Sequence, residues 1–298
     1  MLARSYLYVP GHRPALAAKA ARSDADVIVV DLEDGVPPSE RTAARQSLAE
    51  FVAAAARAPG RRPSVAVRVN PLDSAEVSAE LAAAVDAGIR LIRIPKVASI
   101  SDVQDATVLL ATLERRAGVS QGMVRLQLGI ESALGVLRAA DLAACDRVVA
   151  LALGATDLAA DLGLAVGDDG AGLLTVRSLL VLASAGAGIA PPIDSVQREL
   201  DDLDRLRASS ERSRAIGFHG RSAIHPAQIP VLNEVFTPSA QEVAWARNIV
   251  ELQIPGAQIG EYGPGGREMV DAAVVRRARR ILLLAGLTDE DDRASPDA

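Results

Sequence analysis

Short apolar runs alternate with longer amphipathic stretches along most of this chain, and this alternation constrains the fold more than any other feature. A run of consecutive hydrophobic residues is typical of a buried β-strand that is covered on both faces. We expect eight strands, at residues 5–10, 27–34, 65–70, 91–97, 125–131, 148–154, 189–194 and 215–219. A (β/α)8 barrel closes with eight parallel strands, each followed by a helix.

The stretches between these runs have the spacing of amphipathic helices. Segment 39–57, for example, begins with Ser39 as a candidate N-cap and carries apolar residues at helical intervals. We expect further helices at 14–23, 74–87, 101–116, 133–144, 174–186, 196–212 and 227–236. A doubly wound open sheet would give the same pattern, but eight regularly spaced strands favour an α/β protein with a TIM (β/α)8 barrel over residues 1–237.

The pattern changes after residue 237. Two helical stretches, 238–252 and 267–286, are separated by a segment rich in glycine and proline, which indicates an exposed loop. We therefore expect a C-terminal helical appendage over 238–287. The acidic and polar residues 288–298 predict a disordered tail.

The composition excludes several classes of protein. Hydrophobic residues make up 49% of the 298 residues, so the chain can bury a large core. A net charge of -6 gives nucleic-acid phosphates no general attraction, and we expect no nucleic-acid partner. The single cysteine cannot form an internal disulfide, and no apolar run is long enough for a signal peptide or a membrane span. We expect a cytoplasmic protein with no membrane partner.

Charged and polar residues gather where the predicted strands end. In a barrel of this kind, the reacting groups lie at the carboxyl ends of the strands and in the loops that follow. The candidates, taken along the chain, are Asp31, Glu33, Asp34, Arg68, Asn70, Lys96, Glu131 and Asp157. We therefore expect the active site at this end of the barrel.

Glu131 and Asp157 follow adjacent predicted strands, and both could bind one cation. Two carboxylates, completed by water and substrate oxygens, are the usual ligands of Mg²⁺ in proteins. Each carboxylate could instead cap the backbone N–H groups of a loop or helix. The spacing alone favours neither interpretation.

Arg68 closes an otherwise apolar strand, where its guanidinium suits a substrate carboxylate or phosphate. An ion pair with Asp31, Glu33 or Asp34 fits its position equally well. Lys96 could form a Schiff base in a metal-free aldolase, or it could form an ion pair that neutralises the acidic site. If a metal is present, we expect Glu33 and Asp34 to orient its bound waters.

These motifs, taken in order, resemble the citrate lyase β-subunit-like branch of the HpcH/HpaI aldolase superfamily. The resemblance runs from about residue 4 to residue 282. It is carried by RSYLYVPGHRP at 4–14, DVIVVDLEDGVPPSER at 26–41, VRVNPLD at 67–73, IPKVAS at 94–99, GIESALGV at 129–136, ALGATDLAADLG at 152–163, GFHGRSAIHPAQI at 217–229 and MVDAAVVRRARRIL at 269–282.

The resemblance implies a TIM barrel that uses Mg²⁺, or Mn²⁺, to cleave or form a carbon–carbon bond in a 3-hydroxyacyl-CoA such as malyl-CoA, citramalyl-CoA or β-methylmalyl-CoA. The metal ligands of the family fall on Glu131 and Asp157, and Glu131 would also contact the substrate. The substrate-binding arginine falls on Arg68. Arg13 matches an arginine of the first loop, for which contact with a CoA phosphate or carboxylate is implied. Asp271 matches the carboxylate that acts on the acetyl methyl group.

Asp271 lies on the appendage, and the resemblance implies that it reaches the barrel of a neighbouring subunit in a homotrimer or hexamer. Three alternatives remain open. The chain could be a citrate lyase β subunit that cleaves a citryl thioester on an acyl carrier protein, a barrel that binds acyl-CoA without catalysis, or a class II aldolase that acts on free 2-keto-3-deoxy acids. Retention of Glu131, Asp157, Arg68 and Asp271 argues against the second, and the block around Asp271 argues against the third.

Overall fold

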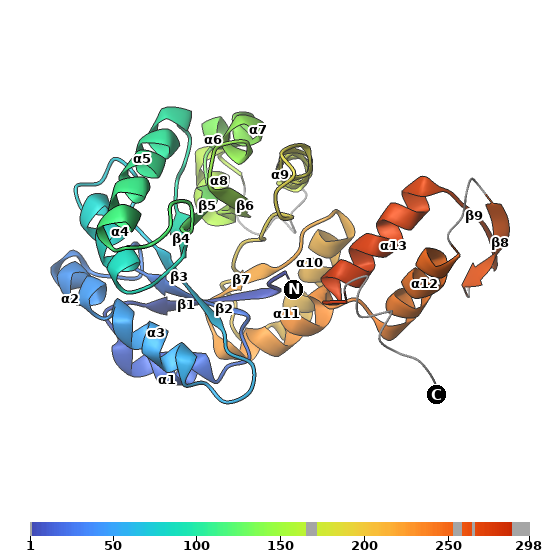
Figure 1. Cartoon of the computed structure of the whole chain (residues 1–298), viewed down its shortest axis with the longest axis horizontal. Coiled ribbons are helices and arrows are strands. Elements are labelled where there is room, and N and C mark those ends of the chain that lie inside the picture. Colours follow the sequence, from blue (N-terminus) through green and yellow to red (C-terminus); the bar gives the residue numbers. More distant parts are fainter. Residues whose placement is uncertain (1, 165–171, 253–257, 264–265, 288–298) are drawn as a thin grey trace. The chain divides into compact units, whose positions relative to one another are not determined.

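The computed structural model describes residues 2–164, 172–252, 258–263 and 266–287. These residues divide into two compact units, Ala3–Phe236 and the part of the chain from Thr237 onward. The first unit holds a parallel sheet with its helices, and the second holds two helices and a hairpin (Figure 1). The predicted tail at 288–298 lies outside the described residues.

The first unit is built on seven parallel strands. They are β1 (Ser5–Pro10), β2 (Val27–Asp31), β3 (Ser64–Arg68), β4 (Leu91–Ile94), β5 (Arg125–Ile130), β6 (Val148–Leu153) and β7 (Arg221–Ala223). Their order in the sheet is β6-β5-β4-β3-β2-β1-β7, so each strand from β1 to β6 lies beside its neighbour in sequence. Every residue of β2 is buried, as expected for an apolar strand in a sheet that helices cover.

Two isolated bridges connect the edges of this sheet. Ala152 of β6 pairs with Ile193, and Asp194 pairs with Arg221 of β7, both in parallel orientation. The segment around Ile193 therefore takes the place of one more strand between β6 and β7. The sheet and this segment together form a ring, which confirms the predicted TIM-barrel architecture of the α/β class.

The last two predicted strands differ from the structure. Residues 189–194 form bridges and no full strand, because Pro191 and Pro192 lack the N–H groups that a strand ladder requires. The strand predicted at 215–219 was placed too early. Gly220 has a φ of 101°, which interrupts an extended backbone, and β7 begins at the next residue.

Helices pack on the outer face of the ring (Figure 1). They are α1 (Ala17–Ala21), α2 (Arg41–Gln46), α3 (Leu48–Ala56), α4 (Val77–Asp86), α5 (Ile100–Arg116), α6 (Ala133–Leu137), α7 (Ala139–Ala143), α8 (Ala155–Asp161), α9 (Leu174–Gly186), α10 (Leu203–Ala215) and α11 (Ile229–Phe236). Short 3-10 turns precede three of them, at Pro14–Leu16, Pro38–Glu40 and Pro226–Gln228. The predicted helix 196–212 starts later, at Leu203, because the Asp202 carboxylate accepts the N–H of Arg205 as its N-cap.

Strand residues alternate between two buried clusters, because successive side chains of a strand point to opposite faces. The larger cluster packs the strands against the helices and includes Leu7, Ile28 and Val67. The smaller cluster lies inside the ring and consists of Tyr6, Val27, Val29, Ala66, Ala150, Ala152 and Ile193. Its small side chains leave room inside the ring for polar residues.

The C-terminal unit contains α12 (Ala240–Glu251), an antiparallel hairpin of β8 (Gln258–Gly263) and β9 (Gly266–Val270), and α13 (Ala272–Leu284). Its own core is formed by Ala246, Ile249, Val270, Ala278 and Leu282. The prediction of a helix from residue 267 was wrong for the first residues, which belong to β9, and the predicted loop contains β8. No helix in the described ranges is long and apolar enough to cross a membrane.

Candidate active site

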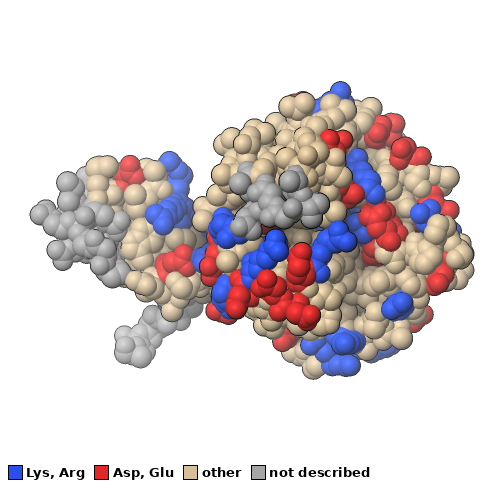
Figure 2. Space-filling view, turned by 180° about the vertical axis from the view of Figure 1, so that it is seen from behind, with Lys and Arg blue, Asp and Glu red and all other residues tan. Residues whose placement is uncertain are grey.

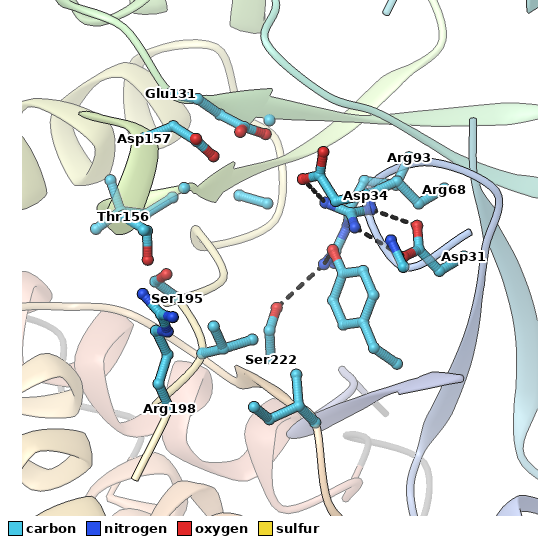
Figure 3. Close-up of a pocket in the computed structure, with 18 of the residues that line it drawn as sticks. Asp31, Asp34, Arg68, Arg93, Glu131, Thr156, Asp157, Ser195, Arg198 and Ser222 are labelled. Atoms are coloured by element: carbon cyan, nitrogen blue, oxygen red, sulfur yellow. Dashed lines mark hydrogen bonds and ion pairs between the residues drawn. The ribbon is translucent and has the colours of Figure 1, made fainter. Parts of the chain in front are cut away.

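A cavity of about 570 Å³ opens at the carboxyl ends of the strands (Figure 3). It therefore lies at the end of the barrel where the charged residues of the sequence gather. The lining residues are Tyr8, Pro10, Asp31, Asp34, Gly35, Arg68, Arg93, Gly129, Glu131, Ala152, Leu153, Gly154, Thr156, Asp157, Ser195, Val196, Arg198, Ser222 and Ile224.

Glu131 and Asp157 face each other across one side of this cavity (Figure 3). Glu131 directly follows β5, and Asp157 lies in the first turn of α8, just after β6. Because β5 and β6 are paired, with Ile130 opposite Leu153, the two carboxylates are brought to the same place. Glu131 is buried, whereas Asp157 is exposed.

Burial is the largest of several effects that together raise the pKa of Glu131 to about 7. The nearby charge of Glu33 and a hydrogen bond with Asp157 also act to raise this pKa, while the backbone N–H of Lys96 and the charge of Arg68 act to lower it. Glu131 therefore holds a proton more readily than an ordinary carboxyl group. A cation that binds here would replace that proton.

Two glycines make room for the Glu131 carboxylate. A Cβ atom added at Gly154 would lie 2.7 Å from Cδ and 2.9 Å from Oε2 of Glu131, and one added at Gly129 would collide with Oε1. Two carboxylates beside an open cavity fit Mg²⁺, which is bound by one or two carboxylates and keeps water or substrate oxygens as further ligands. Within the described ranges no group of three or more His, Cys, Asp or Glu side chains could hold a metal.

Arg68 is bound by carboxylates on three sides. Its Nε and Nη2 donate to Oδ1 and Oδ2 of Asp31 at 2.7 and 2.9 Å, and Nη1 lies 2.7 Å from Oε2 of Glu33. Asp34 lies farther away, at 3.5 Å. Burial lowers the pKa of Arg68, but the hydrogen bonds and charge of Asp31 outweigh it and raise the pKa. The ion pair considered from the sequence is therefore present, and Arg68 also lines the cavity.

Lys96 is engaged by two of the predicted acidic residues. Its Nζ lies 2.7 Å from Oε1 of Glu33 and 3.4 Å from Oδ1 of Asp34. Burial acts to lower the pKa of Lys96, but the hydrogen bond with Glu33 outweighs burial and raises this pKa. Burial in turn raises the pKa of Glu33, against the charges of Arg68 and Lys96. A Schiff base requires an uncharged amine, so this environment disfavours that role for Lys96.

Two other predicted residues have different surroundings. Arg13 is exposed at the start of the turn Pro14–Leu16 and is not among the residues that line the cavity. Asp271 belongs to the C-terminal unit, where it is the N-cap of α13. Its Oδ1 accepts the N–H groups of Ala273 and Val274 at 2.8 and 3.0 Å, and these hydrogen bonds lower the pKa of Asp271.

Several residues of the cavity were not predicted from the sequence, and Arg93 is the most informative of them. Its guanidinium donates from Nε and Nη2 to Oε1 of Gln127 at 3.1 and 2.8 Å, and from Nη1 to the Tyr8 hydroxyl at 2.9 Å and Ser222 Oγ at 3.1 Å. The signal was a charged residue inside the apolar run LIRI at 91–94. Tyr8 and Ser222 are ordinary strand residues that carry no such signal.

Acidic and basic side chains are interspersed on the face shown in Figure 2. They do not form a broad patch of one sign there.

The chain matches the family model described as HpcH/HpaI aldolase/citrate lyase over residues 4–226. It is 34% identical to citrate lyase subunit beta of Leuconostoc mesenteroides subsp. cremoris, over 95% of this chain and 93% of that protein. It is 36% identical to a (3S)-malyl-CoA thioesterase of Cereibacter sphaeroides, over 91% and 89%. It is also 34% identical to an L-malyl-CoA/beta-methylmalyl-CoA lyase of Rhodobacter capsulatus, over 94% of each chain.

A solved structure has the same fold. It is protein CitE from Mycobacterium tuberculosis in complex with magnesium, acetoacetate and coenzyme A, with a TM-score of 0.73 and 31% identity over 95% of this chain and 97% of that one. The chain belongs to the HpcH/HpaI aldolase/citrate lyase family. The predicted family and the prediction of a lyase are confirmed, and the magnesium in the solved relative confirms the metal predicted for this family.

Proposed function

We propose that this protein is a Mg²⁺-dependent lyase of 3-hydroxyacyl-CoA esters, which cleaves them to a keto acid and a short acyl-CoA or forms them by Claisen-type condensation. The facing carboxylates Glu131 and Asp157 carry this proposal, because they lie beside Arg68 in a cavity at the catalytic end of a barrel. The lyase named among its relatives, and the CoA and acetoacetate in the solved relative, support the same substrate class.

Glu131 and Asp157 would hold the metal, with Glu131 kept in place by the space at Gly129 and Gly154. Bound Mg²⁺ supplies Lewis-acid polarisation of substrate oxygens. Glu33 and Asp34 both contact Arg68 and Lys96. From there they would orient water in the site.

Arg68 would bind the carboxylate of the acid half of the substrate. Asp31 accepts from Nε and Nη2, and Glu33 and Asp34 both lie beside Nη1, so the second hydrogen of Nη2 is the one without a carboxylate. These carboxylates thus fix the orientation of the guanidinium and leave that hydrogen for the substrate. Arg13, exposed in the first loop, would contact a phosphate of the CoA.

Asp271 would exchange the proton on the methyl carbon of the acyl group. The N–H groups of Ala273 and Val274 lower its pKa, so the carboxylate predominates near neutral pH. In the condensation direction, this carboxylate removes a proton from the methyl carbon of the acyl group. In the cleavage direction, Asp271 must first be protonated, and it then gives that proton to the same carbon. We further propose that Asp271 serves the barrel of a neighbouring subunit in a homotrimer or hexamer.

Ester cleavage tests this proposal. Purified protein would be incubated with malyl-CoA, citramalyl-CoA, β-methylmalyl-CoA and citryl-CoA, with Mg²⁺ or with EDTA, while keto acid, acyl-CoA and free CoA are measured. We expect cleavage of at least one ester that EDTA abolishes and that Asp157→Asn reduces to background. Asp105→Asn, which makes the same change on the exposed face of α5, should retain wild-type turnover.

Two other results would contradict the proposal. Silence on every ester, from folded and metal-loaded protein, would exclude a CoA-ester lyase with these substrates. Release of free CoA without a keto acid would indicate hydrolysis, the activity for which the Cereibacter sphaeroides relative is named.

A second candidate is a citrate lyase β subunit that acts on a citryl thioester of an acyl carrier protein. The match to citrate lyase subunit beta over nearly the whole chain favours it. Cleavage of a citryl thioester on a carrier protein, together with inertness towards the CoA esters, would identify this function.

A further inference from the structure

Arg93 carries a buried charge that is bound only by neutral groups. The residue is 2% exposed, and its guanidinium donates to the side chains of Gln127, Tyr8 and Ser222. No ion pair joins it to an Asp or Glu among the described residues. Transfer of a cation from water to a protein interior costs free energy unless an opposite charge accompanies it. A buried guanidinium with neutral partners is therefore a candidate to bind an anion.

Other arginines of the barrel are arranged differently. Arg147 donates from Nη1 and Nη2 to the Glu114 carboxylate at 3.0 and 2.9 Å, and Arg68 is paired with Asp31. Arg221 has neutral hydrogen-bond partners, but it is not among the residues that line the cavity. Among these arginines, Arg93 combines neutral partners with a place in the cavity wall.

The strand register places Arg93 below the carboxylate pair in the same cavity. Arg93 of β4 lies opposite Gln127 of β5, and Gln127, Gly129 and Glu131 share one face of the chain because side chains alternate along a strand. Gly129 contributes no side chain, and the Glu131 carboxylate occupies the volume at that level, between its own backbone and Arg93. Arg93, Gly129 and Glu131 all line the cavity, and Figure 3 shows Arg93 next to Arg68.

Tyr8 connects the two arginines of the cavity. The Cζ of Arg68 lies 5.0 Å from the centre of its ring, and the Cζ of Arg93 lies 5.5 Å from the same point. Asp31 and Glu33 already neutralise Arg68. The positive charge that has no carboxylate beside it is thus the one on Arg93.

We propose that Arg93 binds a second carboxylate of the substrate and so selects thioesters whose keto-acid half is a dicarboxylate. This inference rests on the proposed function and names a specificity-determining residue of the same site. One carboxylate of the acid half lies at Arg68, and the other reaches Arg93, where the Tyr8 hydroxyl and Ser222 are neutral neighbours. On the carbon that bears the hydroxyl, a citryl thioester carries a carboxymethyl group with this second carboxylate, a citramalyl thioester carries a methyl group and a malyl thioester carries a hydrogen.

Substrate preference tests the assignment. The values of kcat/KM for citryl-CoA and citramalyl-CoA would be measured for the wild type, Arg93→Gln and Arg93→Lys. We expect the wild type to prefer citryl-CoA, and Arg93→Gln to lower that preference by roughly 10- to 100-fold, because a charge-assisted hydrogen bond is lost. The effect should fall mainly on KM. Arg93→Lys keeps the charge and should retain part of the preference.

Tyr6→Phe is the matched control. The Cζ of Arg93 lies 5.1 Å from the ring of Tyr6, which belongs to the same buried layer but does not line the cavity. Removal of its hydroxyl changes the packing around Arg93 and leaves the charge in place, so the substrate preference should remain. An equal loss on both esters in Arg93→Gln would overturn the proposal, since that is the result of a purely structural role.

Keto-acid binding separates this inference from the proposed function. Calorimetry with Mg²⁺ present should show that the wild type binds oxaloacetate more tightly than pyruvate, and that Arg93→Gln loses this difference. If no thioester is cleaved but this binding difference depends on Arg93, the lyase proposal fails and the assignment of Arg93 stands. The wild type could cleave citramalyl-CoA yet show no preference for citryl-CoA and no tighter binding of oxaloacetate. The assignment of Arg93 would then fail, whether or not the variants fold.

Discussion

At the scale of single residues, the site depends on two positions that have no side chain. Gly154 has a φ of -98°, which alanine can adopt, so the space around Glu131 is what requires glycine there. The carboxylate of Glu131 occupies the volume that a methyl group would fill. Residue size at this position therefore decides whether the Glu131 carboxylate, the proposed metal ligand, can take its place.

We expect Gly154→Ala to weaken Mg²⁺ binding by roughly 10- to 100-fold, because the added methyl group displaces the Glu131 carboxylate. Titration of Mg²⁺ by calorimetry measures the effect. Gly186→Ala in α9 is the control: nothing lies within 4 Å of its added methyl group, and it should stabilise the fold by about 0.4–1 kcal/mol without changing Mg²⁺ affinity. Wild-type affinity for Mg²⁺ in folded Gly154→Ala protein would show that the space at Gly154 has no role in metal binding.

The predictability of the site differs from residue to residue. Glu131 and Asp157 end apolar runs, where a carboxylate is conspicuous, and the structure brings the two together. Arg93 lies within a strand, and its importance depends on what faces it from β1, β5 and β7. Those neighbours come from distant parts of the sequence, so only the closed ring reveals that its partners are neutral.

At the scale of secondary-structure elements, one buried ion pair holds α5 to the chain that leads into β6. Glu114 of α5 is fully buried and binds Arg147, and it also accepts the N–H groups of Val124 and Gly122 at 2.7 and 2.9 Å. Arg147 has a φ of 69°, a conformation that costs energy for a residue with a side chain. The ion pair therefore compensates for strain at the point where β6 begins.

Burial alone would raise the pKa of Glu114, but the hydrogen bond with Arg147 outweighs it and lowers the pKa from 4.5 to about 2. The stabilisation is thus present above about pH 4.5 and is lost as the pH falls towards 2. We expect Glu114→Gln to lower the free energy of unfolding at pH 7 by roughly 3–5 kcal/mol, and to flatten its pH dependence in this window. Urea unfolding at several pH values measures both effects.

Asp86→Asn provides the comparison, because Asp86 forms an exposed ion pair with Arg116. Its loss should cost under about 1 kcal/mol. If both variants gave the same small loss, the buried pair would have no special part in stability.

Most elements of the barrel follow from the sequence, since β1 to β6 each fall on a predicted apolar run. The exceptions share a cause in backbone chemistry. Two prolines prevent a ladder at 189–194, and a capping aspartate sets the start of α10 and of α13. The hairpin of β8 and β9 was missed because its glycines and prolines are equally typical of a loop.

At the scale of the whole molecule, the C-terminal unit is the part for which we propose a role in a neighbouring barrel. The unit has its own core, and it carries Asp271 at the start of α13. The family resemblance implies that this carboxylate acts in a neighbouring subunit. Because a cyclic oligomer repeats one heterologous contact around its axis, each subunit would then both give and receive an Asp271.

Co-expression of two inactive variants tests this arrangement. Glu131→Gln removes a proposed metal ligand, and Asp271→Ser removes the carboxylate while serine still caps α13. With equal expression and random assembly, the whole population should recover about one quarter of wild-type activity, because half of the barrels are intact and half of the neighbours supply Asp271. Mixed oligomers, verified by mass, that remain inactive would indicate that each site is built within one chain.

The two bridges at Ile193 and Asp194 have a consequence for how this barrel can diversify. All seven strands of the sheet have ladder partners, whereas the ring is completed by single residue pairs. The chain that follows them carries Ser195 and Arg198 into the cavity wall. Mutations there can alter the ligands that a descendant accepts while the sheet keeps nearly all of its hydrogen bonds. The segment that closes the ring is thus a place where substitutions can change ligand selectivity with little loss of folding stability.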